Sequence, residues 1–350
     1  MAYTTIDDPT IYFNTVLYTG DGNASQAITG VGHQPDWLWI KARSAGNAHV
    51  LQDVVRGISG SKYRFLQSQG DDAEGTSSDN DGVSSLDSDG FTVGFSNSGG
   101  WNENAITYAA WNWKAGGTAS SNTDGSITSS VSANQTAGFS IVSYTGTGSA
   151  LTCGHGLGAV PEWIIVKDRD AAANWNTYHI ANGNGNTSQL NLGNAPSATS
   201  SWNSTTPTSS VFSLGAVGAV NTSSNDYIAY CFAEKQGYSK IGQYTGNGNA
   251  NGAFLYLGFK PAFIIIKDIS STDPWTLLDN KRSPRNLMNA RLFPSSSNAE
   301  NTSADICDFV ANGIKFRGTN DGFNGSRNYL YYAVAESPFV NSKKVPNNAR

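Results

Sequence analysis

The chain has 350 residues, a net charge of -5, 14% charged residues, 11% aromatic residues and 38 glycines. Its length exceeds what one hydrophobic core usually serves, so two or three domains are expected. The acidic balance argues against a nucleic-acid-binding protein, because neutralising phosphates requires a basic surface, and the aromatic content argues against a disordered chain.

A phrase with the pattern Tyr-Thr-Gly-x-Gly occurs three times, and the residues after it keep one spacing. In every copy a proline follows the tyrosine 17 residues later, and an Asp or His follows the proline 18 residues later. The three sets are Tyr18, Pro35 and Asp53; Tyr144, Pro161 and His179; and Tyr244, Pro261 and Asp279. A repeat on the scale of about 100 residues predicts three copies of one structural unit of domain size.

Each unit is expected to consist of β-strands. Just after each proline, an apolar run that ends in lysine occupies residues 37–41, 163–167 and 263–267, which is typical of a central strand covered on both faces. Residues 139–144 alternate apolar and polar, as in a half-buried strand. Each unit ends in an aromatic strand, at residues 108–113, 227–232 and 329–334. Long helices are not expected, and residues 285–293 are the candidate for a short one.

These elements predict an all-β protein. The expected units cover residues 11–115, 138–236 and 238–340, with a Ser/Thr/Asn/Gly-rich linker at 116–137 and a polar tail at 341–350. Runs of strands with Gly and Asn turns favour three tandem antiparallel β-sandwich, jelly-roll-like repeats, disposed about a pseudo-threefold axis. The Tyr-Thr-Gly-x-Gly phrase is interpreted as a turn, since it lacks the third glycine, the lysine and the helix of a phosphate-binding loop.

The cysteines and the N-terminal residues bear on where the protein is made. Cys153, Cys231 and Cys307 show no metal-binding spacing and are expected to be small buried apolar residues in a protein made in a reducing cytoplasm. The first residues lack the charged and apolar regions of a signal peptide. No apolar segment approaches the ~18 residues of a transmembrane helix, so membrane insertion is not expected.

Acidic residues cluster in the first unit. Asp79 and Asp81, and then Asp87 and Asp89, lie in two Asp-x-Asp-Gly turns, and clustered carboxylates of this kind suit Ca²⁺. Aspartate-glycine is also ordinary turn chemistry, so a solvated acidic loop is the alternative interpretation.

Three aromatic residues, Trp101, Trp202 and Tyr63, lie outside the shared aromatic register, among Asn, Ser and Gly. In such surroundings they suit contact with a glycan or a partner protein. The alternative is that they fill the ends of the sandwiches.

Basic residues concentrate in the third unit, at Lys281, Arg282, Arg285 and Arg291, and form a candidate docking patch or a solvated surface. The spacing of three that Asp279–Arg282 shares with Asp53–Arg56 favours a scaffold salt bridge over a binding dyad.

No pattern of catalytic residues emerges from the sequence. The chain has four histidines, His33, His49, His155 and His179, but no unit carries two of them with a nearby carboxylate at ligand spacing, and there is no HExxH motif. Nucleophile elbows, triads and paired carboxylates are likewise not recognisable, so a non-enzymatic protein without a cofactor is expected.

The repeated phrase, the segment DSDGFTVG at 87–94 and the ending AESPFVN at 335–341 followed by VPNNAR resemble a repeat family of tailed bacteriophages. That family occurs in tail-fibre and other virion proteins, many from aquatic phages. The likeness extends over residues 9–350 and implies an exposed virion component made in the bacterial host cytoplasm, but it carries no established catalytic or binding residues. Because the chain has no fibrous shaft, a compact knob, a tail-tip module or a capsid decoration is expected.

The resulting expectation is a non-enzymatic virion structural protein on the particle surface, either a receptor-binding module of the tail or a capsid decoration. The alternative is a lectin-like module that binds host surface glycans, and a glycan-degrading enzyme is the third hypothesis. Other virion proteins, a host glycan or receptor, and further copies of the chain are the expected partners, whereas nucleic acid is not.

Overall fold

A computed structural model describes residues 3–59, 62–75, 82–94 and 100–347. In these residues the chain folds into antiparallel β-sheets, which confirms the predicted all-β class. The described helices are short: η1 (Pro9–Ile11), η2 (Ile180–Asn182) and α1 (Gly218–Asn221). None of them has the length or apolar character that crossing a bilayer requires.

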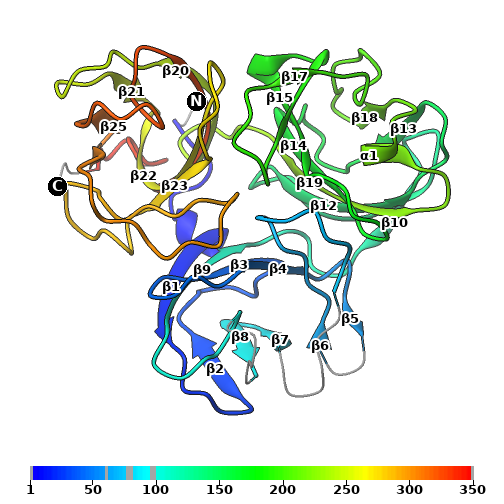
Figure 1. Ribbon diagram of the computed structural model, residues 1–350, viewed down its shortest axis with the longest axis horizontal. Coiled ribbons are helices and arrows are strands. Elements are labelled where there is room, and N and C mark those ends of the chain that lie inside the picture. The colour runs from blue at the N-terminus through cyan, green and yellow to red at the C-terminus, as the bar shows by residue number, and fades with distance from the viewer. Residues whose placement is uncertain (1–2, 60–61, 76–81, 95–99, 348–350) are drawn as a thin grey trace.

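Three large sheets form the frame of the molecule, and Figure 1 shows them as three lobes around a common centre. The first sheet has the order β1 (Phe13–Thr19), β9 (Thr107–Trp113), β3 (Trp37–Ala42) and β4 (His49–Asp53). The second has the order β10 (Ser120–Asn122), β11 (Ser129–Asn134), β12 (Phe139–Thr145), β19 (Asp226–Phe232), β14 (Trp163–Asp168), β15 (Asn176–His179), β16 (Asn186–Gln189) and β17 (Ser197–Ala198). The third has the order β20 (Ser239–Thr245), β26 (Asn328–Pro338), β22 (Phe259–Asp268) and β23 (Thr276–Asp279). We refer to residues 13–113, 120–232 and 239–338 as the first, second and third lobe.

The three large sheets share one arrangement of four strands. In each, the strand that carries the repeated tyrosine pairs with the aromatic strand at the end of the unit. That aromatic strand pairs with the strand after the proline, which pairs with the strand ending at Asp53, His179 or Asp279. The registers also agree, because Trp37 pairs with Trp113, Trp163 with Phe232, and Phe263 with Val334. The residues matched by sequence spacing therefore lie on matching strands.

Smaller sheets cover the outer faces of the large ones. They are β2 (Gln26–Thr29), β8 (Gly90–Val93) and β7 (Val83–Asp87); β13 (Leu151–Gly154) and β18 (Val211–Leu214); and β21 (Phe254–Tyr256), β25 (Gly313–Phe316) and β24 (Cys307–Val310). A short hairpin, β5 (Ile58–Ser59) and β6 (Lys62–Tyr63), completes the described strands. A separate apolar core fills the space between the layers of each lobe. Every residue of β3 and of β14 is buried, which confirms the predicted central strands covered on both faces.

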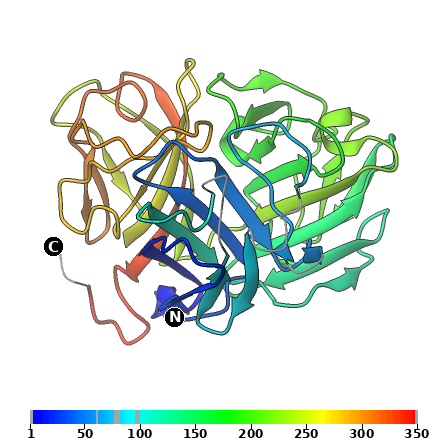
Figure 2. The same ribbon diagram turned by 60° about the horizontal axis from the view of Figure 1, so that its bottom comes forward.

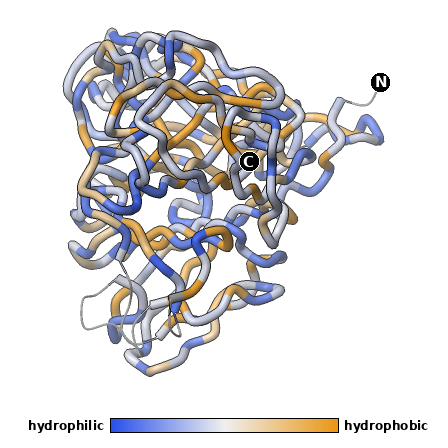
Figure 3. Tube along the Cα trace, turned by 90° about the vertical axis from the view of Figure 1, so that its right-hand side faces the viewer, coloured by the Kyte–Doolittle hydropathy of each residue, from blue (hydrophilic) through white to orange (hydrophobic). Residues whose placement is uncertain are grey.

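The three large sheets lie around the centre of the molecule (Figures 1 and 2). Buried side chains of all three, many of them aromatic, form one core there. Ring centroids lie 4.4 Å apart for Trp37 and Tyr230, which join the first and second lobes. Among the other ring pairs of this core, Trp113 and Phe263 join the first and third lobes at 5.5 Å, and Trp163 and Tyr332 join the second and third at 5.3 Å. Hydrophobic and hydrophilic stretches alternate along the trace in Figure 3, as expected for strands whose loops lie outside this core.

Two expectations about individual segments were wrong. The segment 116–137 is not a free linker, because its strands β10 and β11 pair with each other and extend the second sheet through β12. Residues 285–293 form no helix; instead Met288 and Arg291 make isolated bridges to Cys307 and Asn301. In the segment 116–137, the Ser and Thr residues of strands at the side of the sheet have the composition of a linker. In residues 285–293, pairing with distant residues overrides a weak helical propensity.

The polar C-terminal segment is attached to the body over residues 341–347. The hydroxyl of Ser342 and its backbone N–H donate to Asp7, and the side-chain amide of Asn347 donates to the carbonyl of Ala311 at 2.8 Å. This part of the predicted tail is therefore held in place.

Candidate functional site

The repeated Tyr-Thr-Gly-x-Gly phrase forms the turn that follows the first strand of each four-stranded arrangement. A Cβ atom added to Gly20, Gly146 or Gly246 would lie 2.2 Å from a backbone oxygen of a neighbouring loop. The second glycine of each phrase has a positive φ, at 69° for Gly22, 73° for Gly148 and 63° for Gly248. The predicted structural turn is confirmed, with close backbone approach as a second reason for glycine.

A buried asparagine closes each of these turns, and sequence reasoning missed it. The Oδ1 atoms of Asn102, Asn221 and Asn324 accept hydrogen bonds from the backbone N–H of Asp21, Thr147 and Asn247, at 3.0, 2.7 and 3.3 Å. The tyrosine of each phrase donates to the carbonyl before that asparagine. The available signal was an apolar residue followed by asparagine at a similar place in each unit.

Buried ion pairs join the first lobe to the second. Arg56 donates through Nε to Asp53, and both side chains are fully buried, which confirms the predicted scaffold salt bridge. Glu74 accepts from Arg56 at 3.3 Å and from Arg169 of the second lobe at 3.1 and 2.9 Å. Burial raises the pKa of Glu74, but the hydrogen bonds from Arg169 and the charge of Arg56 outweigh it and hold that pKa below its usual range. We call Arg56, Glu74 and Arg169 the first clamp.

The same arrangement joins the third lobe to the first. Arg282 donates to Asp279 and, at 3.0 Å, to Glu300. Glu300 also accepts two hydrogen bonds from Arg43 of the first lobe, at 3.0 and 2.8 Å. We call Arg282, Glu300 and Arg43 the second clamp. Two of the three junctions between lobes therefore carry a bidentate Arg–Glu pair, which is a strong and geometrically specific contact.

Neighbouring lobes also meet at Asp53, Asp279 and His179. The hydroxyl of Tyr230 donates to Asp53 at 2.8 Å, and the indole of Trp111 donates to Asp279 at 3.0 Å. At the third junction, His179 Nε2 lies 3.3 Å from the carbonyl oxygen of Tyr331. The contact between matching strands thus recurs at each junction, with histidine replacing aspartate in the second lobe.

Within the described residues, no clamp of this kind joins the second lobe to the third. Ile269 stands where the other lobes have Arg43 and Arg169, two residues after the buried lysine. Carbonyls of the second lobe accept from Trp275 Nε1 and Lys267 Nζ, both at 2.9 Å, just as carbonyls of the first lobe accept from Trp175 and Lys167. This junction relies on neutral acceptors and on the shared aromatic core.

The lysine that ends each apolar run is fully buried. Lys41, Lys167 and Lys267 have no exposed surface, and each ammonium group donates to the carbonyl of the next residue at 2.6–2.7 Å. Burial lowers the pKa of each of these lysines to about 8. Lys167 and Lys267 also reach carbonyls of the preceding lobe, so these amines serve as structural donors.

The aromatic residues expected to contact a glycan or partner are placed differently by the structure. Trp101 and Trp202 are 2% and 1% exposed and belong to the outer cores of the first and second lobes, so a contact role for either was wrong. Trp101 packs edge-on against Phe65, and Trp202 donates to the carbonyl of Asn186. Tyr63 is half-buried against the same core as Trp101. The alternative, that such aromatics fill the ends of the lobes, describes Trp101 and Trp202.

The acidic residues proposed as a calcium site fall partly outside the described residues, which exclude Asp79 and Asp81. Asp87 accepts from the hydroxyl of Thr92 at 2.9 Å. Asp89 accepts from the backbone N–H groups of Gly30 and Gly32, at 3.1 and 2.6 Å. In the described part of the chain, no three His, Cys, Asp or Glu side chains gather as a metal site would require. Asp87 and Asp89 serve turns in this structure.

The four basic residues of the third unit do not form one surface. Lys281 and Arg285 are exposed, whereas Arg282 is buried in the second clamp and Arg291 is half-buried with its guanidinium 5.2 Å from the ring centre of Phe293. The docking patch was therefore wrong for Arg282, because the carboxylates of Asp279 and Glu300 draw that side chain inward.

All four histidines and all three cysteines are buried. One nitrogen of each histidine ring lies within hydrogen-bond distance of a backbone carbonyl, and burial lowers the pKa of each ring. The cysteines are free thiols in apolar cores, as predicted.

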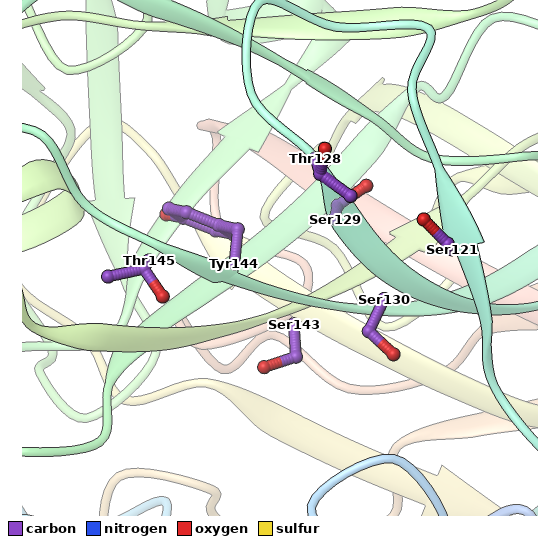
Figure 4. Close-up of a pocket in the computed structure, with 7 residues that line it drawn as sticks. All are labelled: Ser121, Thr128, Ser129, Ser130, Ser143, Tyr144 and Thr145. Atoms are coloured by element: carbon purple, nitrogen blue, oxygen red, sulfur yellow. The ribbon is translucent and has the colours of Figure 1, made fainter.

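Among the surface hollows of the described residues are three with volumes of about 320–470 Å³. The one in Figure 4 has a volume of about 320 Å³, lies beside β10, β11 and β12, and is lined by hydroxyl groups without a charged side chain. Its one aromatic residue, Tyr144, is buried and donates to the carbonyl of Val220. A second hollow of about 470 Å³ contains His33, Asp36 and Lys114, but His33 Nδ1 faces the Thr10 carbonyl and Asp36 accepts from the N–H of Gly117. The third, of about 320 Å³, lies at Tyr3 and Tyr256.

Comparison with known proteins places this chain in a family by a match over most of its length, and not by any of these sites. No curated protein matches it. The family described as "Domain of unknown function (DUF7483)" matches residues 8–338, a range that includes all three lobes, and the chain belongs to that family.

Proposed function

We propose that this protein is a non-enzymatic structural component of a bacteriophage virion. It is exposed on the particle surface, as a receptor-binding module of the tail or as a capsid decoration. The resemblance of its repeated phrases to virion proteins of tailed phages supports this proposal. The buried ion pairs that join the lobes support it further.

The observation that carries the proposal is the placement of Glu74 and Glu300 between lobes. Each glutamate joins an arginine of its own lobe to an arginine of the next, and its side chain is 5% or 10% exposed. Buried charges of this kind could have formed a reactive cleft, but here they fix one lobe against another. A body held rigid in this way suits a protein that must keep its shape on a particle.

We also infer that the chain consists of three tandem antiparallel β-sandwich repeats, jelly-roll-like and disposed about a pseudo-threefold axis. The common strand order and register support this inference. So do the cyclic contacts at Asp53, His179 and Asp279. The repeats cover residues 11–115, 138–236 and 238–340, and the hairpin of β10 and β11 is an addition to the second.

Detection of the protein in intact particles tests the proposed function. Antibodies against the whole chain are applied to purified phage particles from cells infected with the phage that encodes it, and gold labels are located by electron microscopy. Labels at the tail tip or over the head are expected, with pre-immune serum as the control. Protein found in the infected cell but missing from purified particles would overturn the proposal.

A lectin-like module for host surface glycans is the second candidate, and it is compatible with a place on the tail. The observation that favours it is an exposed aromatic residue beside a surface hollow of the third lobe, Tyr256.

A further inference from the structure

The hollow of about 320 Å³ at the third lobe combines an exposed aromatic ring with polar groups of several kinds. It lies where the N-terminal segment meets β20 and β21. The side chains that line it include those of Tyr3, Glu234, Gln236, Ser239, Lys240 and Tyr256. Its volume falls at the lower end of the range of small-molecule sites, which is about 300–1,000 Å³.

Tyr256 lies on β21, an edge strand of the outer sheet. Leu255 points into the core of the lobe, and its neighbours Phe254 and Tyr256 are 50% and 49% exposed. No other aromatic side chain of the described residues is as exposed. An exposed aromatic ring beside a hollow offers an apolar surface that a ligand can cover.

The other two lobes lack these rings at the matching positions. The pairs Leu255–Ile314, Ile28–Phe91 and Cys153–Phe212 hold the same place in the three outer sheets. By this register, Tyr256 corresponds to Thr29 and Gly154, and Phe254 corresponds to Ala27 and Thr152. The aromatic pair is therefore a property of the third lobe and not of the common scaffold.

The N-terminal segment closes one side of the hollow. The hydroxyl of Tyr3 donates to the carbonyl of Gly258 at 2.7 Å. Burial, with a hydrogen bond and charge interaction from Tyr256, raises the pKa of Tyr3 to about 12, so its hydroxyl remains a neutral hydrogen-bonding group. Lys240 Nζ lies 5.3 Å from the ring centre of Tyr256.

The hollow is lined by side chains of both charges. Glu234 supplies a carboxylate, Lys240 supplies an ammonium group, and Gln236 supplies an amide that can both donate and accept. Glu234 and Gln236 are exposed, and one carboxylate oxygen of Glu234 accepts from the Ile241 N–H at 3.4 Å. This set favours a ligand without net charge that carries both donors and acceptors.

We propose that this hollow binds a neutral saccharide unit. The C–H bonds on one face of a pyranose ring would pack against the Tyr256 ring, and its hydroxyl groups would exchange hydrogen bonds with Glu234, Gln236 and Lys240. This inference rests on the second candidate function, the lectin-like module, and names its site and the class of its ligand. Saccharide binding can be measured whether or not the protein is found in particles, so the two tests can fail separately.

Saturation-transfer NMR on the full chain tests the proposal. The probes are maltose, cellobiose, lactose and chitobiose at millimolar concentration, with the dipeptide Ala-Ala as a small zwitterionic control. Transfer to at least one disaccharide and none to the dipeptide is expected. Tyr256→Thr, which installs the residue of the first lobe, should weaken binding about tenfold, the equivalent of one aromatic contact of ~1.4 kcal/mol.

Phe254→Ala is the matched control, because Phe254 is equally exposed on the same strand but does not line the hollow. This variant should bind the same disaccharide with affinity within about a factor of two of the unchanged chain. The proposal would be overturned by no transfer to any disaccharide, by equal binding of the Tyr256→Thr variant, or by binding of the dipeptide alone. Equal losses in both variants would also overturn it, since they would place binding on the strand surface.

Discussion

Glu74 of the first lobe and Arg169 of the second form a bidentate ion pair across the junction between their lobes. Arg169 Nε donates to Oε1 at 3.1 Å, and Nη2 donates to Oε2 at 2.9 Å. Glu300 and Arg43 repeat this pair between the third lobe and the first, with the same two nitrogens of arginine. Buried pairs of this kind are not themselves a source of much net stability, but removing one partner leaves the other charge without compensation.

Replacing Glu74 with Gln should therefore destabilise the protein strongly. Arg56 is fully buried and Arg169 is 13% exposed, so both would lose a charged acceptor in a place that water reaches poorly. We expect the free energy of unfolding to fall by about 3 kcal/mol in urea titrations.

Asp308→Asn is the control for this variant. It breaks the pair with Arg317, whose side chain is 42% exposed, and should cost less than about 1 kcal/mol. Equal effects of the two substitutions would contradict the role assigned to the first clamp.

The junction without a clamp should open more readily than the one with it. Asp273 N–H donates to the Gly193 carbonyl across the junction of the second and third lobes, and Ala173 N–H donates to the Asp71 carbonyl at the matching place between the second and first. Local opening exposes such amides to exchange with solvent. Measured by NMR hydrogen exchange, the protection factor of the Asp273 amide should be at least about tenfold lower than that of the Ala173 amide. This ratio is equivalent to a difference of ~1.4 kcal/mol in the free energy of opening. Equal protection would show that the clamp does not decide where the lobes separate.

The repeat and its strands could be predicted because they are recorded as spacing along the chain. A proline, an apolar run and a lysine recur at fixed intervals, and the run needs no partner to be recognised as a buried strand. The contacts between lobes could not be predicted in this way. Arg169 lies 95 residues from Glu74, and nothing in either local sequence indicates that they meet.

The predictions that the structure contradicts failed for the same reason, because they depend on contacts between residues far apart in the sequence. Trp101 and Trp202 stand among Gly, Ser and Asn, so local composition suggested surface loops, yet these loops fold back over the outer cores. The strand β11 has a Ser-rich outer face and few apolar residues, so its pairing with β12 decides its conformation. Both cases depend on long-range packing, which local propensity does not record.

Replacing Gly146 with Ala should disrupt the repeated turn. The added Cβ would lie 2.2 Å from the Thr222 carbonyl oxygen and 3.0 Å from the Tyr227 ring, so the loop would have to move. We expect a loss of about 1–3 kcal/mol in the free energy of unfolding. Gly185→Ala, in an exposed part of the same lobe with no atom within 4 Å of the added Cβ, should change stability by less than about 1 kcal/mol. A neutral Gly146→Ala variant would contradict the close approach.

Acid should destabilise the protein partly through His179. Burial lowers the pKa of this ring from 6.5 to about 4, and its Nδ1 accepts from the Ala181 N–H while Nε2 faces the Tyr331 carbonyl. Between these two pKa values the unfolded chain takes up a proton that the folded chain refuses, so stability is present above pH 6.5 and is lost as the pH falls toward 4.

A His179→Asn variant removes this titration and leaves the other buried histidines in place. From about pH 7 to about pH 4.5, the unchanged protein should lose about 2–3 kcal/mol more stability than the variant in urea titrations. Because His33, His49 and His155 titrate in both proteins, their contributions cancel in this comparison. The same pH dependence in both proteins would mean that the ring at the third junction becomes protonated without unfolding, and that the junction tolerates a charge that its neutral contacts should exclude.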